Sequence, residues 1–252
     1  MLIDQINANL AQIRHFQLHS ELLPHVGQHY DEYRILLIGE SHYLPTDDEI
    51  NYENHEDVFR NWYEDKLEHI PGVPDEYWEE DRCWFNTRGI IADFLNGGQC
   101  DNEFLTTPNK LFDEVMREKK MVPQTYNLFN YCAFFNYFQR PHLREKKGFS
   151  SLCPDESKKT YNIVKAVINI LEPILVLFVS TKASDNYVRN KYGSYENRPA
   201  NVFCHLYDRD ICDNGKKVPE KEYQEHLFGH PLHGWLNREE FKRVLSEYLK
   251  NF

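Results

Sequence analysis

The sequence predicts an α/β fold of three layers, in which helices cover both faces of a central, mainly parallel sheet of about four strands. Strand-like runs alternate along the chain with helix-like segments, and the runs lie at 34–39, 126–132, 174–180 and 201–206. The first and third runs are apolar at successive positions rather than at every second position, which predicts strands buried on both faces. Buried strands that alternate with helices are typical of a parallel sheet covered on both sides.

The segments between the strands carry start and stop signals of helices. The clearest helix lies at 107–120, where Thr107 can act as the N-cap and Pro108 fits the first helical position. Apolar residues then recur in this segment at the spacing of one helix face. Asn237 and Glu240 form a capping pair before the last helix. The other helices are expected at 1–16, 88–98, 155–171, 181–193 and 236–251.

The composition indicates a single domain that spans 1–252 and carries an acidic insertion at about 47–81. The chain has 252 residues, of which 41% are hydrophobic, so it can bury a sizeable core. The formal net charge is −11, and 47–81 contributes fourteen acidic residues against only Arg60 and Lys66. A strongly acidic balance argues against nucleic-acid binding when taken alone. The rest of the chain is close to neutral, so local basic loops can still contact phosphates.

Three features of the sequence bear on compartment and cofactors. No run of 18 apolar residues is present, so we expect no membrane-spanning segment and no membrane partner. The six cysteines are scattered without a CxxC pair, which is typical of reduced thiols in a cytoplasmic protein. His226, His230 and His233 lie close in sequence, but glycine and proline between them interrupt the helix that would align them. We therefore expect no metal site and no cofactor.

Polar and aromatic residues follow the strands at the positions where open α/β sheets bind ligands, beyond the carboxyl ends of the strands. The strand at 34–39 leads into a run of chemically versatile residues, Gly39, Glu40, Ser41, His42 and Tyr43. The predicted strand at 126–132 carries Asn130 and is followed by Arg140-Pro141. A His-Pro pair, His230-Pro231, precedes the last helix.

These elements, taken in order over roughly 34–250, resemble the uracil-DNA glycosylase superfamily. The Gly-led motif at Gly39 is similar to the family's "GQDPYH" and "GEAPG" forms. The stretch from Asn130 to Arg140-Pro141 is similar to "TNxVKxRPP", and "LEPILVLFVSTKA" is similar to "LKPKLIVLLGxxA". The pair His230-Pro231 corresponds to the family's His-Pro motif. The resemblance implies the α/β fold and a pocket that receives a base flipped out of DNA.

The resemblance also implies roles for individual residues, which we expect to converge on one cleft at the strand ends. Glu40 would orient water or stabilise the cationic sugar, and His230 would donate a hydrogen bond to the departing base. Asn130 would read the edge of the base, because its amide offers both a donor and an acceptor. Tyr43 would exclude the thymine methyl group, and Leu232 would fill the vacated stack. Gly39, Ser41 and His42 complete the substrate-binding set.

The sequence also departs from the family's motifs. Ser41 stands where "GQDPYH" has its water-activating Asp, and His42 replaces the Pro of both motifs. Two functions therefore remain open. The first is an N-glycosylase that removes uracil or a related damaged base from DNA. The second is a catalytically inactive module on the same fold, which binds a nucleobase or nucleotide or meets a protein partner through the acidic segment.

Overall fold

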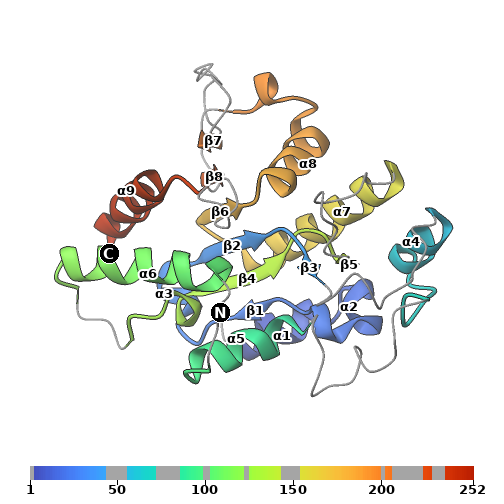
Figure 1. Cartoon of the computed structure of the whole chain (residues 1–252), viewed down its shortest axis with the longest axis horizontal. Helices are drawn as coiled ribbons and strands as arrows, with labels where there is room; N and C mark the ends of the chain where they lie inside the picture. The colour runs from blue at the N-terminus through green and yellow to red at the C-terminus, as the bar shows by residue number, and fades with distance from the viewer. Residues whose placement is uncertain are drawn as a thin grey trace.

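The computed structural model describes most of the chain, and its strands lie in the middle of the molecule with helices on both sides (Figure 1). The residues that the structure describes are 3–43, 56–71, 86–98, 103–121, 125–142, 154–199, 202–205, 224–228 and 236–252. The predicted α/β fold with a mainly parallel central sheet is confirmed.

The central sheet has six strands in the order β1-β4-β2-β6-β8-β7, two more than the expected four or so. Every neighbouring pair is parallel except β1 with β4, which is antiparallel. A small second sheet pairs β3 with β5 in parallel, beyond the ends of β2 and β4 (Figure 1). The strands are β1 His25–Val26, β2 Ile35–Gly39, β3 His42–Tyr43, β4 Cys132–Asn136, β5 Pro141–His142, β6 Leu175–Val179, β7 Val202–His205 and β8 Gln224–Phe228.

Successive residues of the central strands point to opposite faces of the sheet, and each face has its own core. In β2, Leu36 and Ile38 belong to a core that includes residues of α1, α2, α4, α7 and α8. Ile35 and Leu37 belong to a second core with α5, α6 and α9. The continuous apolar runs in the sequence therefore reflect burial on both faces, as expected for a three-layer α/β/α arrangement.

The helices agree with most of the expected segments. They are α1 Ile3–Leu10, α2 Arg14–Leu18, α3 Tyr30–Tyr33, α4 Glu56–Tyr63, α5 Thr87–Leu95, α6 Glu103–Glu118, α7 Pro154–Leu171, α8 Thr181–Tyr192 and α9 Arg238–Tyr248. Asn237 caps α9, since its side chain accepts a hydrogen bond from the backbone N–H of Glu240. Two expected helices differ: the one at 1–16 is divided by a turn at 11–13 into α1 and α2, and α6 begins at Glu103 rather than Thr107. Pro108 consequently lies inside α6. The helices α3 and α4 were not expected.

The prediction of a strand at 126–132 is wrong, because a local turn takes most of that segment. The side chain of Asn127 accepts a hydrogen bond from the backbone N–H of Phe129 and caps a 3-10 helix at Leu128–Asn130. The strand β4 begins only at Cys132 and continues to Asn136. This shift of the strand along the sequence changes which asparagine reaches the end of the sheet.

The strand β8, which lies between β6 and β7 in the sheet, was not expected from the sequence. Its sequence, QEHLF, is too polar to read as a buried strand, yet Glu225 is fully buried. The Glu225 carboxylate accepts hydrogen bonds from Tyr187 at 2.6 Å and Tyr192 at 3.0 Å, and it pairs with Lys191 at 2.5 Å. A buried charge is tolerated when it is paired and hydrogen-bonded in this way.

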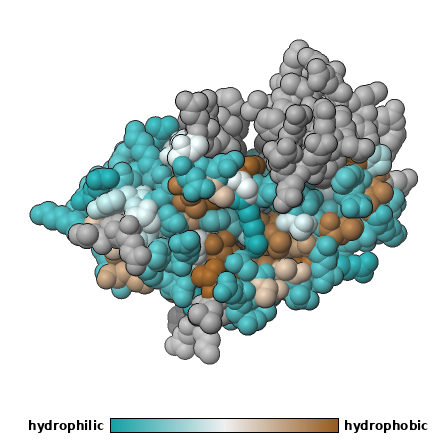
Figure 2. Space-filling view, turned by 90° about the horizontal axis from the view of Figure 1, so that it is seen from below, coloured by the Kyte–Doolittle hydropathy of each residue, from teal (hydrophilic) through white to brown (hydrophobic). Residues whose placement is uncertain are grey.

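Among the described residues, no helix is both long and apolar enough to cross a membrane. The face shown in Figure 2 is mainly hydrophilic, and its hydrophobic residues gather in small groups rather than in one broad patch.

Candidate functional site

The carboxyl ends of β2, β4, β6 and β8 lie along one edge of the sheet. In the parallel register, Gly39 at the end of β2 is paired with Asn136 at the end of β4. Val179 at the end of β6 is paired with Phe228 at the end of β8. The segments that leave these strands therefore begin side by side, and this edge is the place where such sheets bind ligands.

Gly39 lets two larger side chains approach the end of β2. A Cβ atom at Gly39 would lie 2.3 Å from Asn136 Oδ1 and 2.5 Å from Phe104 Cζ, both far inside normal contact. Close packing therefore requires glycine at this position. Backbone conformation does not, since the φ angle of Gly39 is not in the left-handed region. Asn136 and Phe104 are both buried, so an amide and an aromatic ring flank the glycine.

Glu40 is held by the start of α8. The hydroxyl of Ser180, the residue after β6, donates to Glu40 Oε2 at 2.5 Å. The same hydroxyl oxygen accepts from the backbone N–H of Ala183 at 3.1 Å and so caps α8. The N-terminus of a helix favours a negative charge, so the carboxylate is well placed there. The side chain of Ser180, the residue that follows β6, therefore fixes the position of the Glu40 carboxylate.

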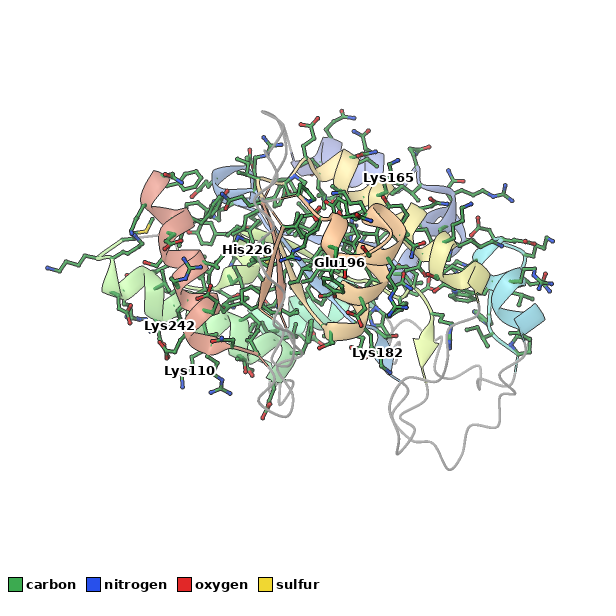
Figure 3. The ribbon with its side chains drawn as sticks, turned by 90° about the horizontal axis from the view of Figure 1, so that it is seen from above. Lys110, Lys165, Lys182, Glu196, His226 and Lys242 are labelled. Carbon is green, nitrogen blue, oxygen red and sulfur yellow. The ribbon has the colours of Figure 1, made fainter. Side chains whose placement is uncertain are left out.

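Lys182 adds a positive charge to the same region. It is the second residue of α8, at the end of the helix that directly follows β6 (Figure 3). Partial burial lowers the pKa of Lys182, while the nearby charge of Glu40 acts in the opposite direction. The Glu40 carboxylate therefore favours the charged form of the Lys182 ammonium group, although burial opposes it.

Ser41 and His42 are turned into the protein. The Ser41 hydroxyl donates to the backbone carbonyl of Arg140 at 3.1 Å, which ties the two segments leaving β2 and β4. His42 is buried, and its Nε2 lies 3.1 Å from the hydroxyl of Thr87 at the start of α5. Burial lowers the pKa of His42 to about 4, so the ring is neutral near pH 7. Both side chains are thus engaged by neighbouring segments, Ser41 by the one that leaves β4 and His42 by α5.

Asn130 does not join this group, which corrects the most specific expectation from the sequence. It ends the 3-10 helix before β4, and its backbone carbonyl accepts from the backbone N–H of His29 at 2.8 Å. Five strand residues, Cys132 to Asn136, separate it from the edge where Gly39 lies. At about 3.3 Å per residue, that places it more than roughly 13 Å from this edge.

Three other predicted site residues are described in part or not at all. Tyr43 forms β3 with His42, and its backbone is paired with His142 of β5. The side chain of Tyr43 lies outside the described residues, as do His230 and Leu232. The strand β8 ends at Phe228, two positions before His230.

The sequence favours Asn136 over Asn130 only through an inexact spacing to Arg140. In "TNxVKxRPP" the Asn precedes the Arg by five positions; here Asn136 lies four positions before Arg140, and Asn130 lies ten positions before it. Ser180 could also have been found, since it directly follows an apolar strand. Phe104 had no local signal, because only the tertiary packing brings α6 to Gly39.

A separate hollow lies between α6 and α9, and its character differs from that of the strand-end site. Its lining includes Lys110 and Lys242, both labelled in Figure 3. Lys242 pairs with Glu114 at 3.1 Å and with Glu118 at 2.8 Å. These charges serve to join the two helices, so we place the candidate site at the strand ends.

Sequence comparison matches the chain to no protein-family model and to no curated protein.

Proposed function

We propose that the chain binds a nucleobase at the strand-end site and hydrolyses the N-glycosidic bond of uracil or a related damaged base in DNA. The observation that carries this proposal is the register of β2 and β4, which sets the amide of Asn136 beside Gly39 and one residue from Glu40. A base-reading group and an acidic group then share one edge of the sheet.

In this proposal Asn136 takes the role that the resemblance gave to Asn130. Its amide can donate to one carbonyl of the base and accept from the ring N–H, which is the pattern on the edge of uracil. The ring of Phe104 offers an apolar surface for stacking against the base. The carboxylate of Glu40 orients water or stabilises the positive charge that develops on the sugar.

Ser180 and Lys182 would position Glu40 rather than contact the substrate. The 2.5 Å hydrogen bond from Ser180 limits the directions in which the carboxylate can turn. Such preorganisation is valuable because no reorientation is needed as charge develops.

One observation favours the alternative of a nucleobase-binding module without catalysis. Ser41 stands at the position of the water-activating Asp, and its hydroxyl is engaged with the carbonyl of Arg140 at 3.1 Å. If Glu40 does not replace that Asp, the pocket would hold a base without breaking the glycosidic bond.

The test is release of free uracil from a single-stranded oligonucleotide with one uracil, measured for the wild type and matched variants. Asn136→Asp replaces a donor by an acceptor and should lower the rate by about a hundred- to a thousandfold. Glu40→Gln should lower it similarly. Asn130→Asp makes the same chemical change at the opposite end of β4 and should leave the rate near that of the wild type.

The pattern of results separates the two functions. Equal losses for Asn136→Asp and Asn130→Asp would contradict the assignment of the base-reading group. If the wild type releases no base but binds free uracil, and Asn136→Asp weakens this binding, the site is a binding module. A wild type that neither releases uracil from the oligonucleotide nor binds free uracil would refute both functions.

A further inference from the structure

A second group of chemically versatile side chains lies away from the strand ends, between α2 and the segment that follows α4. His15 and His19 are four positions apart, so they occupy the same face of one helical turn. Asp65 follows the end of α4 and lies opposite them. Each of the three residues offers a ligand atom, and these atoms all lie within 4.8 Å of one another.

The spacing of this group suits direct coordination of a metal ion. His15 Nδ1 lies 2.9 Å from Asp65 Oδ1. Two ligands at about 2.0–2.1 Å from a tetrahedral zinc ion are roughly 3.3 Å apart, so only a small movement would admit an ion. Two imidazoles and one carboxylate are also a donor set that divalent transition metals prefer.

A second observation points to a missing ligand. The exposed fraction of the side chain is 3% for His15 and 0% for His19. Nε2 of His15 and both ring nitrogens of His19 make no hydrogen bond of normal geometry among the described residues, and His19 has only a looser polar contact with the backbone of Trp62. Glu21 Oε1 is 3.8 Å from His19 Nδ1, which is beyond hydrogen-bonding distance. Buried polar atoms are almost always paired, so three such nitrogens in one place require an explanation.

The simpler explanation, a histidine paired with a carboxylate, accounts for only part of the group. The contact between His15 and Asp65 satisfies one ring nitrogen. It leaves the ring nitrogens of His19, the most buried of the three residues, without a hydrogen bond of normal geometry. Arg14 also contacts Asp65 at 3.2 Å, but its side chain is 79% exposed and can swing into solvent. A bound cation would satisfy both imidazoles and the carboxylate together.

We propose that His15, His19 and Asp65 bind a divalent transition-metal ion, and that Zn²⁺ is the ion that best fits this set. Zn²⁺ accepts nitrogen and oxygen ligands in a tetrahedral arrangement, with the fourth position left for Glu21 or water. Because the site is buried between two helical segments, the ion would join α2 to the end of α4. This inference does not depend on the proposed function.

The metal site would also stabilise one wall of the strand-end region. Trp62 of α4 stacks on the ring of His19, with centroids 3.7 Å apart. Its indole N–H donates to the carbonyl of Gln139 at 2.7 Å, in the segment between β4 and β5. α2 and α4 both lie on the side of the molecule toward which β3 and β5 extend (Figure 1). An ion bound by His15, His19 and Asp65 would therefore fix the position of α4, which carries Trp62.

The experiment titrates the chelator-treated full chain with Co²⁺, followed by displacement with Zn²⁺. We expect one Co²⁺ per chain with the visible absorption of a tetrahedral complex. We also expect part of the tryptophan fluorescence of the chain to be quenched, because Trp62, one of its four tryptophans, stacks on a ligand. His19→Gln and Asp65→Asn should each weaken binding by at least about tenfold. His29→Gln is the matched control, since His29 also lies beside a carboxylate, Glu32 at 3.0 Å, but without a second histidine.

Two results would overturn the proposal. One is a wild type that binds neither ion. The other is binding and quenching in His19→Gln and Asp65→Asn at the wild-type affinity, which would place the ion elsewhere. Circular dichroism checks that each variant is folded. If His19→Gln does not fold, Asp65→Asn decides by the same two measurements, because Asp65 is partly exposed and its replacement keeps the side-chain shape.

Discussion

Ser180 performs two tasks with one hydroxyl, and its replacement by alanine should reveal both. The hydroxyl oxygen caps α8 through Ala183, and its proton is donated to Glu40. Loss of an N-cap costs about 1 kcal/mol of unfolding free energy. Loss of a hydrogen bond to a charged group costs about 1.5–3 kcal/mol, and the lower part of that range applies because Glu40 is only half-buried. We therefore expect Ser180→Ala to destabilise the protein by about 2–3 kcal/mol.

The control for this prediction is Asn237→Ala, which removes a cap of the same kind and nothing else. Asn237 accepts from the backbone N–H of Glu240 at 3.1 Å, the same length as the capping bond of Ser180. It should cost about 1 kcal/mol. Urea denaturation measures both values. The loss of unfolding free energy in Ser180→Ala beyond that in Asn237→Ala is the part due to the hydrogen bond with Glu40.

A double-mutant cycle then isolates the contact. In a Glu40→Ala background, Ser180→Ala should cost only the capping part, so the coupling between the two residues should be about 1–2 kcal/mol. A coupling near zero would refute the argument that Ser180 holds Glu40. A Ser180→Ala variant no less stable than Asn237→Ala would lead to the same conclusion without the cycle.

Two further predictions follow from the same site. Gly39→Ala should destabilise the protein by about 1–3 kcal/mol in urea denaturation, because the new methyl group would displace Asn136 or Phe104. The same variant should lose nucleobase binding. An unchanged free energy of unfolding would show that Asn136 and Phe104 do not pack tightly against Gly39. The lowered pKa of His42, about 4, predicts a loss of stability on acidification. The His42 ring takes up a proton below about pH 6.5 in the unfolded chain, but only below about pH 4 in the folded protein. The free energy of unfolding should therefore fall across this window by about 3 kcal/mol in total. His42→Gln should reduce the slope of unfolding free energy against pH by up to about 1.4 kcal/mol per unit between pH 6 and pH 4, and an unchanged slope would mean that the folded protein accepts this proton.

Much of the scaffold could be predicted because its signals are local. The apolar runs at β2 and β6 required burial on both faces, and the structure has both faces covered. The capping pair of Asn237 and Glu240 marked the start of α9 within one residue. Gly39 and Glu40 were correctly placed at the end of the first buried strand of the central parallel ladder, since the composition changes sharply there.

The errors arose where a non-local contact outweighed a local pattern. Glu225 reads as a surface residue, but hydroxyl and ammonium groups from α8 allow it to occupy a central strand. Asn130 and Asn136 both lie among aromatic residues, so composition could not distinguish them. The parallel register of β4 against β2 decided between them, and register depends on pairing across the sheet.

The amino-acid sequence by itself determined the layered α/β fold, the order of most of its elements, and the acidic residue that follows the first buried strand. Periodicity, capping residues and apolar runs act between near neighbours, so they can be recognised along the chain. Only the tertiary structure decided that Asn136, Ser180 and Phe104 meet at Gly39, and that His15 and His19 meet Asp65. These residues come from different elements, and their proximity results from strand register and helix packing, which no short stretch of sequence encodes.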